Sequence, residues 1–206
     1  MKIYDISMSI HENMPVYKNR ADKKPKLVSE RNQGGVYESR LEMNLHTGTH
    51  IDAPMHMLSE GRTTEDYPLE RFVVPCKVFD FRNLKVIGAE ELQAKDIQKN
   101  DFILLKTDNS EIDDFASDFT YLSANAAEYL KEKGILGVGI DALGIERDQT
   151  NHETHKTLLQ AGIVILEGLR LKNIKEGRYL LVALPLKIAG VEAAPVRAIL
   201  LDEIFG

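Results

Sequence analysis

The sequence lacks several features that would assign a protein to a class. It contains no tryptophan and one cysteine, Cys76, so no internal disulfide can form. No segment approaches the roughly 20 consecutive apolar residues that a membrane-spanning helix needs. The N-terminal residues include Asp5 and no continuous apolar run, which is unlike a secretory signal. We therefore expect a cytoplasmic protein that does not enter a membrane.

Motifs for nucleic acids and nucleotides are also missing. The formal net charge is −6, and no cluster of lysine and arginine residues builds the basic face that binds a duplex. Neither GxGxxG nor GxxxxGK[ST] occurs, so the phosphate-cradling glycine motifs are absent. With 43% hydrophobic and 28% charged residues, the composition is typical of a globular protein. We therefore expect a small molecule as the binding partner.

Strand-like and helix-like segments alternate along the second half of the chain, which indicates an α/β fold. Ser123 is a typical helix N-cap and Gly134 a typical C-terminal stop, and Thr150 or Asn151 is expected to cap the next helix. No repeat and no shift of composition divides residues 1–206, so we expect one domain. The expected helices are 89–97, 124–133 and 152–161, and the expected strands are 3–10, 36–45, 73–81, 102–107, 135–141, 162–167, 179–187 and 195–203.

The stretch HTGTHIDAPMH concentrates the residues that carry chemistry. Alternate side chains of an extended chain point to the same face, so its histidines and its aspartate can share one face. Eleven extended residues would span about 35 Å, so the chain must fold back, and Gly48 and Pro54 permit this. Imidazole and carboxylate together suit zinc, iron or manganese. The competing interpretation is a polar loop with hydrogen-bonded core histidines. The four residues are His46, His50, Asp52 and His56.

Further candidate ligands lie in the second half. His152 and His155 are three residues apart on an expected helix, so they share a face. Glu167 interrupts an apolar strand, and burying an unpaired carboxylate costs several kcal/mol, so it needs a partner. An ion pair with Arg170 or Arg197 is one solution. A metal is the other, and the histidine cluster favours it.

Five side chains are then candidate metal ligands, more than the three protein ligands of a catalytic zinc. Because carboxylates can bridge, five ligands fit two divalent ions about 3.5–4 Å apart, which would lower the pKa of a bound water. His56 is left over, and a histidine beside such a water is suited to general acid–base catalysis. The five candidates are His46, His50, Asp52, His155 and Glu167.

This stretch resembles the HxGTHxDxPxH signature of the metal-dependent cyclase family, which includes bacterial kynurenine formamidases and isatin hydrolases. The segments YLSANAAEYLKEKGILGVGID, HKTLLQAGIVILEGLRL and YLLVALPLKIAGVEAAPVRAIL are also similar to the family, so the resemblance extends from Tyr4 nearly to the C-terminus. It implies a single domain of the swivelling β/α/β-like type, with a mixed sheet and flanking helices. It also implies a homodimer or homotetramer.

The resemblance further implies how the site works. His46 and His50 would bind a first metal, and Asp52 would bridge it to a second. That second metal would also be bound by His155, and Glu167 would contact both. The metals would be zinc, with manganese as the alternative.

The implied activity is that of an arylformamidase, which converts N-formylkynurenine and water to kynurenine and formate in tryptophan catabolism. A metal-bound hydroxide would attack the carbonyl, with His56 as proton donor and acceptor. Tyr17 stands where related formamidases have a substrate-lining tryptophan, and Ala142-Leu143-Gly144 replaces their Thr-Pro-Ser. A cyclic amide of the isatin type, or another small acyl compound, is therefore the alternative substrate. A non-catalytic metal-binding protein is the alternative of another class. The role of His152 stays open.

Overall fold

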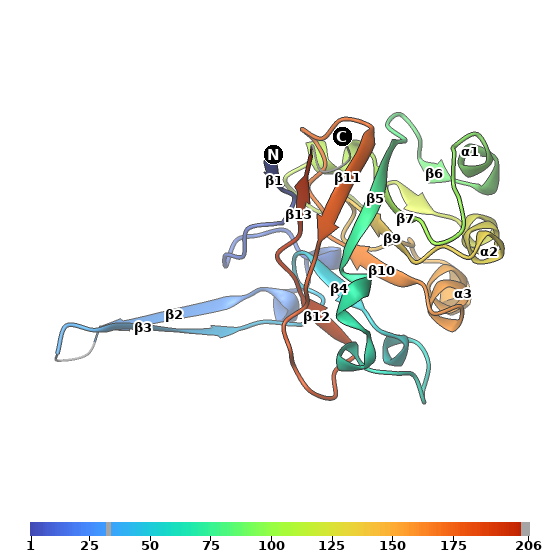
Figure 1. Ribbon diagram of the computed structural model, residues 1–206. Helices are drawn as coiled ribbons and strands as arrows, with labels where there is room; N and C mark the ends of the chain where they lie inside the picture. Colours follow the sequence, from blue (N-terminus) through green and yellow to red (C-terminus); the bar gives the residue numbers. More distant parts are fainter. Residues whose placement is uncertain (32–33, 203–206) are drawn as a thin grey trace.

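A curled sheet of nine strands forms the centre of the computed structural model, in which residues 1–31 and 34–202 are described (Figure 1). The strand order is β1-β13-β11-β5-β7-β9-β10-β4-β12. The four central strands, β5 to β10 in this order, run parallel, and all other neighbours are antiparallel, so the sheet is mixed as expected. In chain order the strands are β1 (Ile3–Asp5), β4 (His50–Asp52), β5 (Val73–Asp80), β7 (Phe102–Lys106), β9 (Gly137–Ile140), β10 (Val164–Glu167), β11 (Gly177–Val182), β12 (Ala193–Pro195) and β13 (Ile199–Leu201).

The curl follows from the connection between β12 and β13. Strand β12 is one edge of the sheet, whereas β13 lies beside the other edge. Only residues 196–198 join them, and three residues span at most about 11 Å. The two edges must therefore approach each other. Hydrogen bonds close the gap: Ile6 N–H donates to Ala198 O, and Val196 N–H donates to Thr49 O, each at 3.0 Å.

The two faces of the sheet carry separate apolar clusters. Along β7, Phe102 and Leu104 belong to the cluster inside the curl, whereas Ile103 and Leu105 face the helices. This alternation follows the two-residue period of a strand, and a strand buried on both faces reads as a continuous apolar run. Cys76 is buried in the first cluster, where burial raises the pKa of its thiol to about 12, as expected for a packing residue.

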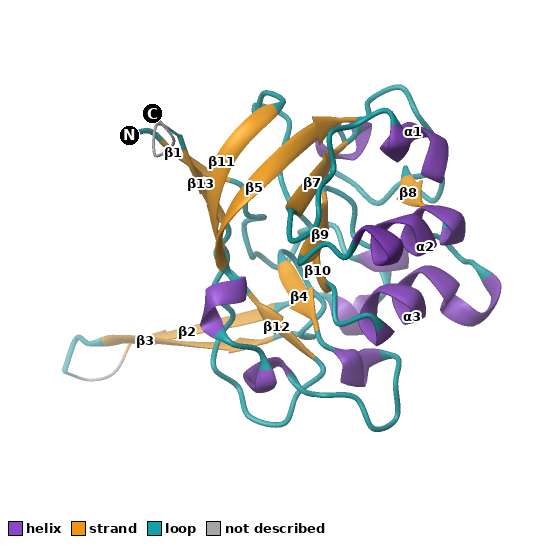
Figure 2. Cartoon of the chain, turned by 45° about the vertical axis from the view of Figure 1, so that its right-hand side comes forward, coloured by secondary structure: helices purple, strands orange, loops and turns teal. Residues whose placement is uncertain are grey.

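Three α-helices cover the outer face of the sheet: α1 (Ala89–Gln93), α2 (Ala124–Lys133) and α3 (Glu153–Gln160) (Figure 2). The predicted limits of α2 are confirmed, because Ser123 Oγ accepts from Ala126 N–H at 3.4 Å and Gly134 adopts φ = 69°. The predicted cap of the next helix was wrong. A 3-10 turn occupies Thr150–His152, and α3 starts after His152, whose left-handed backbone makes no side-chain cap.

The remaining helical segments are single 3-10 turns. They are η1 (Tyr17–Asn19), η2 (Ala21–Lys23), η3 (Pro54–His56), η4 (Thr64–Asp66), η5 (Leu69–Arg71), η6 (Asp108–Glu111) and η7 (Thr150–His152). No helix in the described ranges has the length and apolar character to cross a bilayer.

Other predicted boundaries also required correction. The single strand expected at 195–203 is two strands, β12 and β13, because the chain changes sheet edge there; residue 203 lies outside the described ranges. The strand expected at 36–45 is β3 (Tyr37–Glu42), and it pairs with β2 (Lys26–Arg31), which was not predicted. These two form an arm that leaves the body (Figure 1). A short parallel pair, β6 (Val86–Ile87) and β8 (Tyr121–Leu122), lies near α1.

Candidate metal centre

Strand pairing places three of the predicted ligands on one face. His50 and Asp52 are two residues apart on β4, so their side chains point the same way. Glu167 ends β10 and lies directly opposite His50 in the antiparallel register. All three are buried, and ligand atoms of the three lie within 4.8 Å of one another. The strand face expected from the sequence is therefore present.

Turns bring the flanking histidines to the same place. Gly48 has φ = 77°, and the 3-10 turn η3 starts at Pro54, so the chain folds back at both expected positions. A Cβ at Gly168 would lie 2.4 Å from Gly48 O, so this crossing of two segments requires glycine there. As a result the ring centroids of His46 and His56 lie 4.2 Å apart.

Helix α3 carries the remaining predicted ligand. His155 is buried, and its Nε2 lies 3.2 Å from Glu167 Oε1 and 3.6 Å from Asp52 Oδ2. The ion-pair alternative for Glu167 does not occur, since Arg197 pairs with Asp5 at 2.6 Å and Arg170 turns toward Ile112 O. Strands β4 and β10, helix α3 and two turns therefore bring six predicted residues together: His46, His50, Asp52, His56, His155 and Glu167.

Each of three histidines turns one nitrogen inward and the other toward an oxygen. His50 Nδ1 lies 2.9 Å from Gly48 O, and its Nε2 lies 3.5 Å from both Asp52 Oδ1 and Glu167 Oε2. His46 directs Nδ1 to Asp52 Oδ1 at 2.9 Å and Nε2 to Glu192 Oε1 at 3.3 Å. Histidines that bind metals show this arrangement, because the outer acceptor fixes the tautomer and orients the ring.

His155 repeats the pattern with a different acceptor. Its backbone N–H donates to Glu146 Oε2 at 3.2 Å, and its Nδ1 lies 3.2 Å from Glu146 Oε1, although without hydrogen-bond geometry. Glu146 Oε1 also lies 2.5 Å from Nδ1 of the half-exposed His152. These contacts make Glu146 a positioning residue for His155, and they turn one nitrogen of His152 toward that carboxylate.

The donor set fits divalent cations. Asp52 is fully buried, yet neither carboxylate oxygen has a partner in hydrogen-bond geometry among the described residues. Three histidine nitrogens nevertheless approach these oxygens, at 2.9 to 3.6 Å. A buried carboxylate without hydrogen bonds is costly, and convergence of lone pairs without donor geometry is what ligands around a cation show.

The charges of the cluster point the same way. Burial alone would lower the pKa of His50, but Asp52 and Glu167 overcome it and raise that pKa to about 10. Burial would raise the pKa of Asp52 and of Glu167, but the histidines hold the first well below its usual range and the second at about 2. The carboxylates of Asp52 and Glu167 therefore stay ionised and need positive charge nearby. A metal ion supplies it in place of the protons on the histidines.

His56 differs from the other histidines. Its ring has no hydrogen-bond or ion-pair partner among the described residues, although it lies 5.7 Å from the ring of His155. Burial lowers its pKa, which favours the neutral base near pH 7. Its ring nitrogen also lies within 4.8 Å of ligand atoms of His46 and Asp52. This geometry places a free imidazole at the edge of the cluster.

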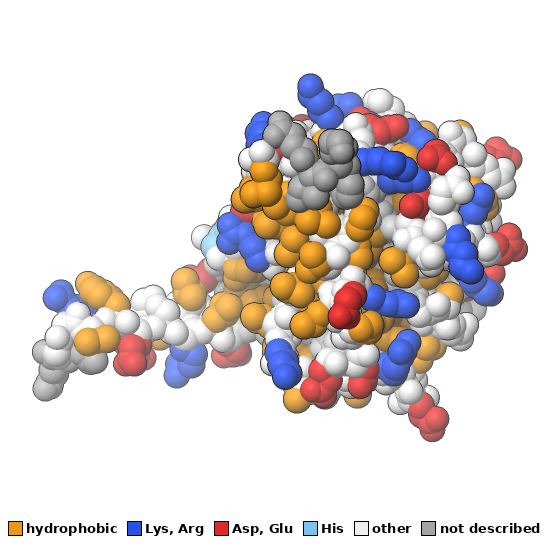
Figure 3. All heavy atoms as spheres, in the orientation of Figure 1, with side chains coloured by type: hydrophobic (Ala, Val, Ile, Leu, Met, Phe, Trp, Pro, Cys, Tyr) orange, Lys and Arg blue, Asp and Glu red, His pale blue; other side chains and the backbone are white. Residues whose placement is uncertain are grey.

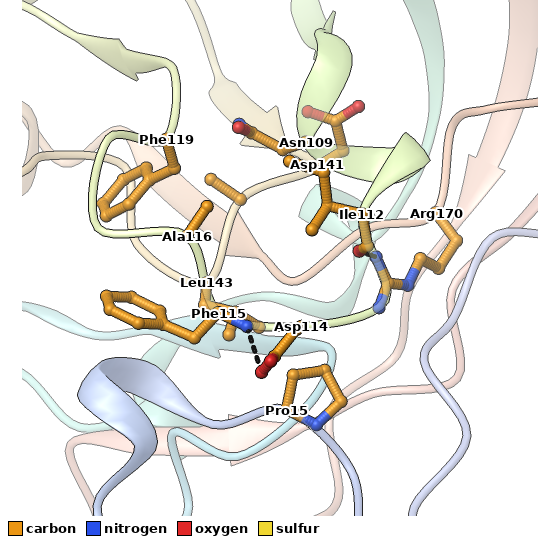
Figure 4. Close-up of a pocket in the computed structure, with 11 residues that line it drawn as sticks. Pro15, Asn109, Ile112, Asp114, Phe115, Ala116, Phe119, Asp141, Leu143 and Arg170 are labelled. Carbon is orange, nitrogen blue, oxygen red and sulfur yellow. Dashed lines mark hydrogen bonds between the residues drawn. The ribbon is translucent and has the colours of Figure 1, made fainter.

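A cavity of about 200 Å³ opens beside the cluster. Tyr17 forms one wall and packs edge-on against Phe115 and Phe119, with ring centroids 5.5 and 6.3 Å away. Figure 4 shows these two phenylalanines at the neighbouring cavity, with Leu143 beside Phe115. The lining residues are Tyr17, Lys23, His46, His56, Met57, Leu143, Gly144, Glu146, Asp148, His152, His155 and Glu167.

The site residues that were not predicted include Glu146, Glu192 and Lys23. Glu192 contacts a histidine far away in the sequence, whereas Glu146 lies nine residues before His155, and no local pattern predicts either contact. The one available signal is the position of Glu146 directly after the buried segment GIDALGI. Lys23 reaches the cavity because Thr47 Oγ1 donates to its carbonyl at 2.8 Å.

The curled α/β sheet and the buried histidine–carboxylate cluster define a metal-dependent hydrolase. Residues 4–147 match the model of a family described as putative cyclase. The chain belongs to this family.

Known relatives are similar to this chain over nearly its whole length. A predicted metal-dependent hydrolase from Bacillus stearothermophilus superimposes with a TM-score of 0.90 at 52% identity, covering 97% of each chain. The kynurenine formamidase of Salinibacter ruber is 36% identical over 98% of each chain. Isatin hydrolase A from Labrenzia aggregata, at 22% identity and a TM-score of 0.83 over 98% of this chain and 94% of its own, shares the fold.

Proposed function

We propose that the protein hydrolyses the C–N bond of an N-formyl arylamine of the N-formylkynurenine type, releasing formate and the arylamine. The observation that carries this proposal is the cluster of three oriented histidines and two buried carboxylates, with the unbonded ring of His56 at its edge. The 36% identity to a kynurenine formamidase over 98% of the chain supports this substrate class.

In this proposal two divalent cations, zinc or alternatively manganese, occupy the cluster. His46, His50, Asp52, His155 and Glu167 would hold them, with Asp52 shared between the two. When bound, the cations polarise the scissile carbonyl and lower the pKa of the attacking water.

The protein's own contribution to the chemistry is proton transfer and positioning. His56 takes a proton as water adds to the formyl carbon, and returns it to the nitrogen as the C–N bond breaks. Its lowered pKa suits the first step, because the imidazole starts neutral. Glu146 and Glu192 keep the rings of His155 and His46 in the orientation that binding requires.

The cavity wall supports a substrate that has an aromatic ring and a carboxylate. Tyr17 offers an aryl face backed by two phenylalanines. Lys23 lines the cavity, with Nζ 5.7 Å from the centroid of that ring, and no carboxylate of the described residues lies within ion-pair distance of its amine. Asp148, the neighbouring acid, is already paired with Lys18 at 2.6 Å. N-formylkynurenine carries both an aryl ring and a carboxylate.

A cyclic amide of the isatin type is the second candidate. Tyr17 is smaller than the indole that stands at this place in related formamidases, so the cavity wall leaves more room for a fused bicyclic substrate. The same metals and His56 would open a lactam by the same proton transfers. A role in metal binding without catalysis is disfavoured, since it needs no free imidazole at the edge of the cluster.

The test is a comparison of N-formylkynurenine, isatin and simple anilides as substrates of protein purified without chelator, with metal content measured in parallel. We expect near two equivalents of metal and fastest turnover of N-formylkynurenine. His56→Ala should keep its metal and lose about 10²–10⁴-fold in rate. Absence of metal from metal-replete preparations, or hydrolysis of none of these compounds, would refute the proposal.

The proposal includes a cytoplasmic homodimer or homotetramer. A buried cysteine thiol agrees with a reducing compartment. The support for self-association is the projecting arm, in which all twelve residues of β2 and β3 are exposed and the strands pair with no other described strand.

A further inference from the structure

One cation at the cavity beside the metal cluster has no partner. Four cationic side chains lie between residues 18 and 24, and three of them contact an oxygen: Lys18, Arg20 and Lys24. The amine of Lys23 makes no hydrogen bond or ion pair within the described part of the chain. Its neighbour Asp22 is held by Arg20 at 2.6 Å. An unpartnered amine in a cavity wall is a group that can orient an anionic ligand.

The backbone of Lys23 is fixed although its amine is free. Its N–H donates to Arg20 O at 3.0 Å, and its carbonyl accepts from the hydroxyl of the buried Thr47 at 2.8 Å. Thr47 directly follows His46 in the turn beside the cluster. The amine therefore extends from a base that is fixed relative to the cluster. Such preorganisation lowers the cost of binding a ligand.

A carboxylate of the same cavity wall is only half engaged. Lys18 contacts Oδ1 of Asp148 at 2.6 Å, and Oδ2 has no hydrogen bond or ion pair within residues 1–31 and 34–202. The amines of Lys18 and Lys23 lie 5.4 and 5.7 Å from the centroid of the Tyr17 ring. The free amine and this carboxylate are thus grouped around one aryl wall. A carboxylate has lone pairs for more than one donor, so Asp148 can accept from a second cation.

Backbone conformation distinguishes the segments that carry this ion pair. Five of the seven described non-glycine residues with positive φ lie in segments 18–19 and 148–152, among them Lys18 at 55° and Asp148 at 50°. Side chains disfavour this region, and an ion pair as exposed as theirs contributes little to stability. Unfavourable conformations of this kind cluster at sites that clamp a ligand. The shape of the cavity rim therefore serves recognition.

We propose that Lys23 and Asp148 recognise a zwitterionic α-amino acid tail of the substrate, with Lys23 binding its carboxylate and Asp148 its ammonium group. This inference rests on the proposed function and concerns the end of the substrate that does not react. His56 and the two charged residues line one cavity, so the amide would lie at the cluster and the tail beside Tyr17. The carboxylate is expected to contribute more than the ammonium group, because Asp148 already has a cation in Lys18.

Three N-formyl arylamines that differ only in the tail separate these contacts. They are N-formylkynurenine, its analogue without the amino group, and 2-formamidoacetophenone, which ends in a methyl ketone. Lys23→Gln should lower kcat/KM roughly 10- to 100-fold on the first two compounds, mainly through KM, and leave the third unchanged. Asp148→Asn should lower it about two- to fivefold on the first compound alone. The metal content of both variants should equal that of the wild type.

Matched controls change the same charges outside the cavity. Lys26→Gln alters the arm of β2 and β3, on which basic and acidic side chains are mixed (Figure 3), and Lys26 pairs there with Glu42 at 3.1 Å. Asp113→Asn alters an exposed acid, and neither residue lines this cavity. Both variants should keep the wild-type kcat/KM on all three compounds. A loss in Lys26→Gln equal to that in Lys23→Gln would show a general effect of charge and overturn the assignment.

Stereochemistry gives a second readout. Contacts to the amide, the carboxylate and the ammonium group fix three points around the substrate, so the wild type should prefer one enantiomer of N-formylkynurenine. Asp148→Asn removes one of these points and should reduce the ratio of the two kcat/KM values. An unchanged ratio would overturn the role of Asp148.

The failure of this inference can be distinguished from the failure of the proposed function. Equal wild-type kcat/KM for N-formylkynurenine and 2-formamidoacetophenone would overturn tail recognition while leaving the hydrolysis of formyl arylamines in place. Hydrolysis of none of the three compounds would refute the proposed function, and product binding would then decide. L-Kynurenine keeps the ring and the tail, so calorimetry should show it binding roughly 10- to 100-fold more tightly than 2-aminoacetophenone. Equal affinity for these two would overturn the inference.

Discussion

Asp52 and Asp141 are both buried aspartates in the same sheet, and their surroundings are opposite. Asp52 ends β4 and Asp141 follows β9, two strands away. Asp141 accepts from Thr107 N–H at 2.9 Å, from the Thr107 hydroxyl at 2.6 Å and from the Ser110 hydroxyl at 2.7 Å. Asp52 has no such donors and is surrounded by histidine nitrogens instead.

This difference distinguishes Asp52, an acid of the candidate metal site, from Asp141, an acid that stabilises the fold. Burial raises the pKa of Asp141 to about 6, since its neutral donors compensate the charge only in part. Histidines hold the pKa of Asp52 well below its usual range although burial opposes this. A buried acid whose charge the protein favours, but whose lone pairs it leaves without hydrogen bonds, is therefore prepared for a cation.

The largest effect is expected from substituting Asp52, the acid without hydrogen-bond donors. Asp52→Asn removes the charge and the bridge, so metal content should fall toward zero and kcat/KM by at least about 10³-fold, or about 4 kcal/mol. Asp141→Asn is the matched control and should keep its metal. Elemental analysis and kinetics on both variants provide the measurement. Full metal content in Asp52→Asn would remove Asp52 from the ligand set.

The next effect concerns Asp141 and pH. Because its folded pKa lies above the ordinary value of 3.8, its proton stabilises the fold below pH 3.8, and this stabilisation is lost as pH rises through about 6. The shift corresponds to an energy on the order of 3 kcal/mol. Asp141→Asn should therefore gain stability relative to wild type between pH 4 and 7, measured by urea unfolding of metal-free protein. Parallel pH profiles of the two proteins would contradict this.

Glu146 lies between the two cases, because it is buried like Asp141 but contacts His155, a proposed metal ligand. Glu146→Gln keeps the shape and weakens the orientation of His155, so metal affinity should fall about 10–100-fold. His152→Ala removes the other contact of Glu146 and should change affinity far less than His155→Ala. Chelator competition on the three variants measures this order. Equal losses in His152→Ala and His155→Ala would make His152 a ligand.

The sequence predicted the part of the site that local spacing determines. His50 and Asp52 share a face because strands have a two-residue period, and Gly48 and Pro54 are where a chain can turn. Glu192 was missed because its contact with His46 depends on where a distant loop passes the sheet, and Glu146 was missed because the 3-10 turn η7 between it and His155 was not predicted. Of the two strands of the arm, β3 was predicted and β2 was not, because β2 is exposed on both faces and shows no alternation of burial. The division of 195–203 into two strands depends on closure of the sheet, which no local pattern encodes.

The smallest expected effect is at the wall of the cavity. Asp141 anchors the segment that continues through Gly144, and a Cβ at Gly144 would lie 3.3 Å from the Tyr17 ring, so loop and ring are in direct contact. Tyr17→Trp enlarges the aryl face that lines the cavity. Stacking of a planar substrate is worth about 0.5–1.5 kcal/mol, or roughly threefold to tenfold in kcat/KM. The variant should therefore favour N-formylkynurenine over a small aliphatic formamide by that factor.

Gly144→Ala, which narrows the same space without touching the metals, should shift the preference in the opposite direction. If both variants leave the ratio of the two kcat/KM values unchanged, Tyr17 serves packing against Phe115 and Phe119, and substrate choice depends on Lys23 instead.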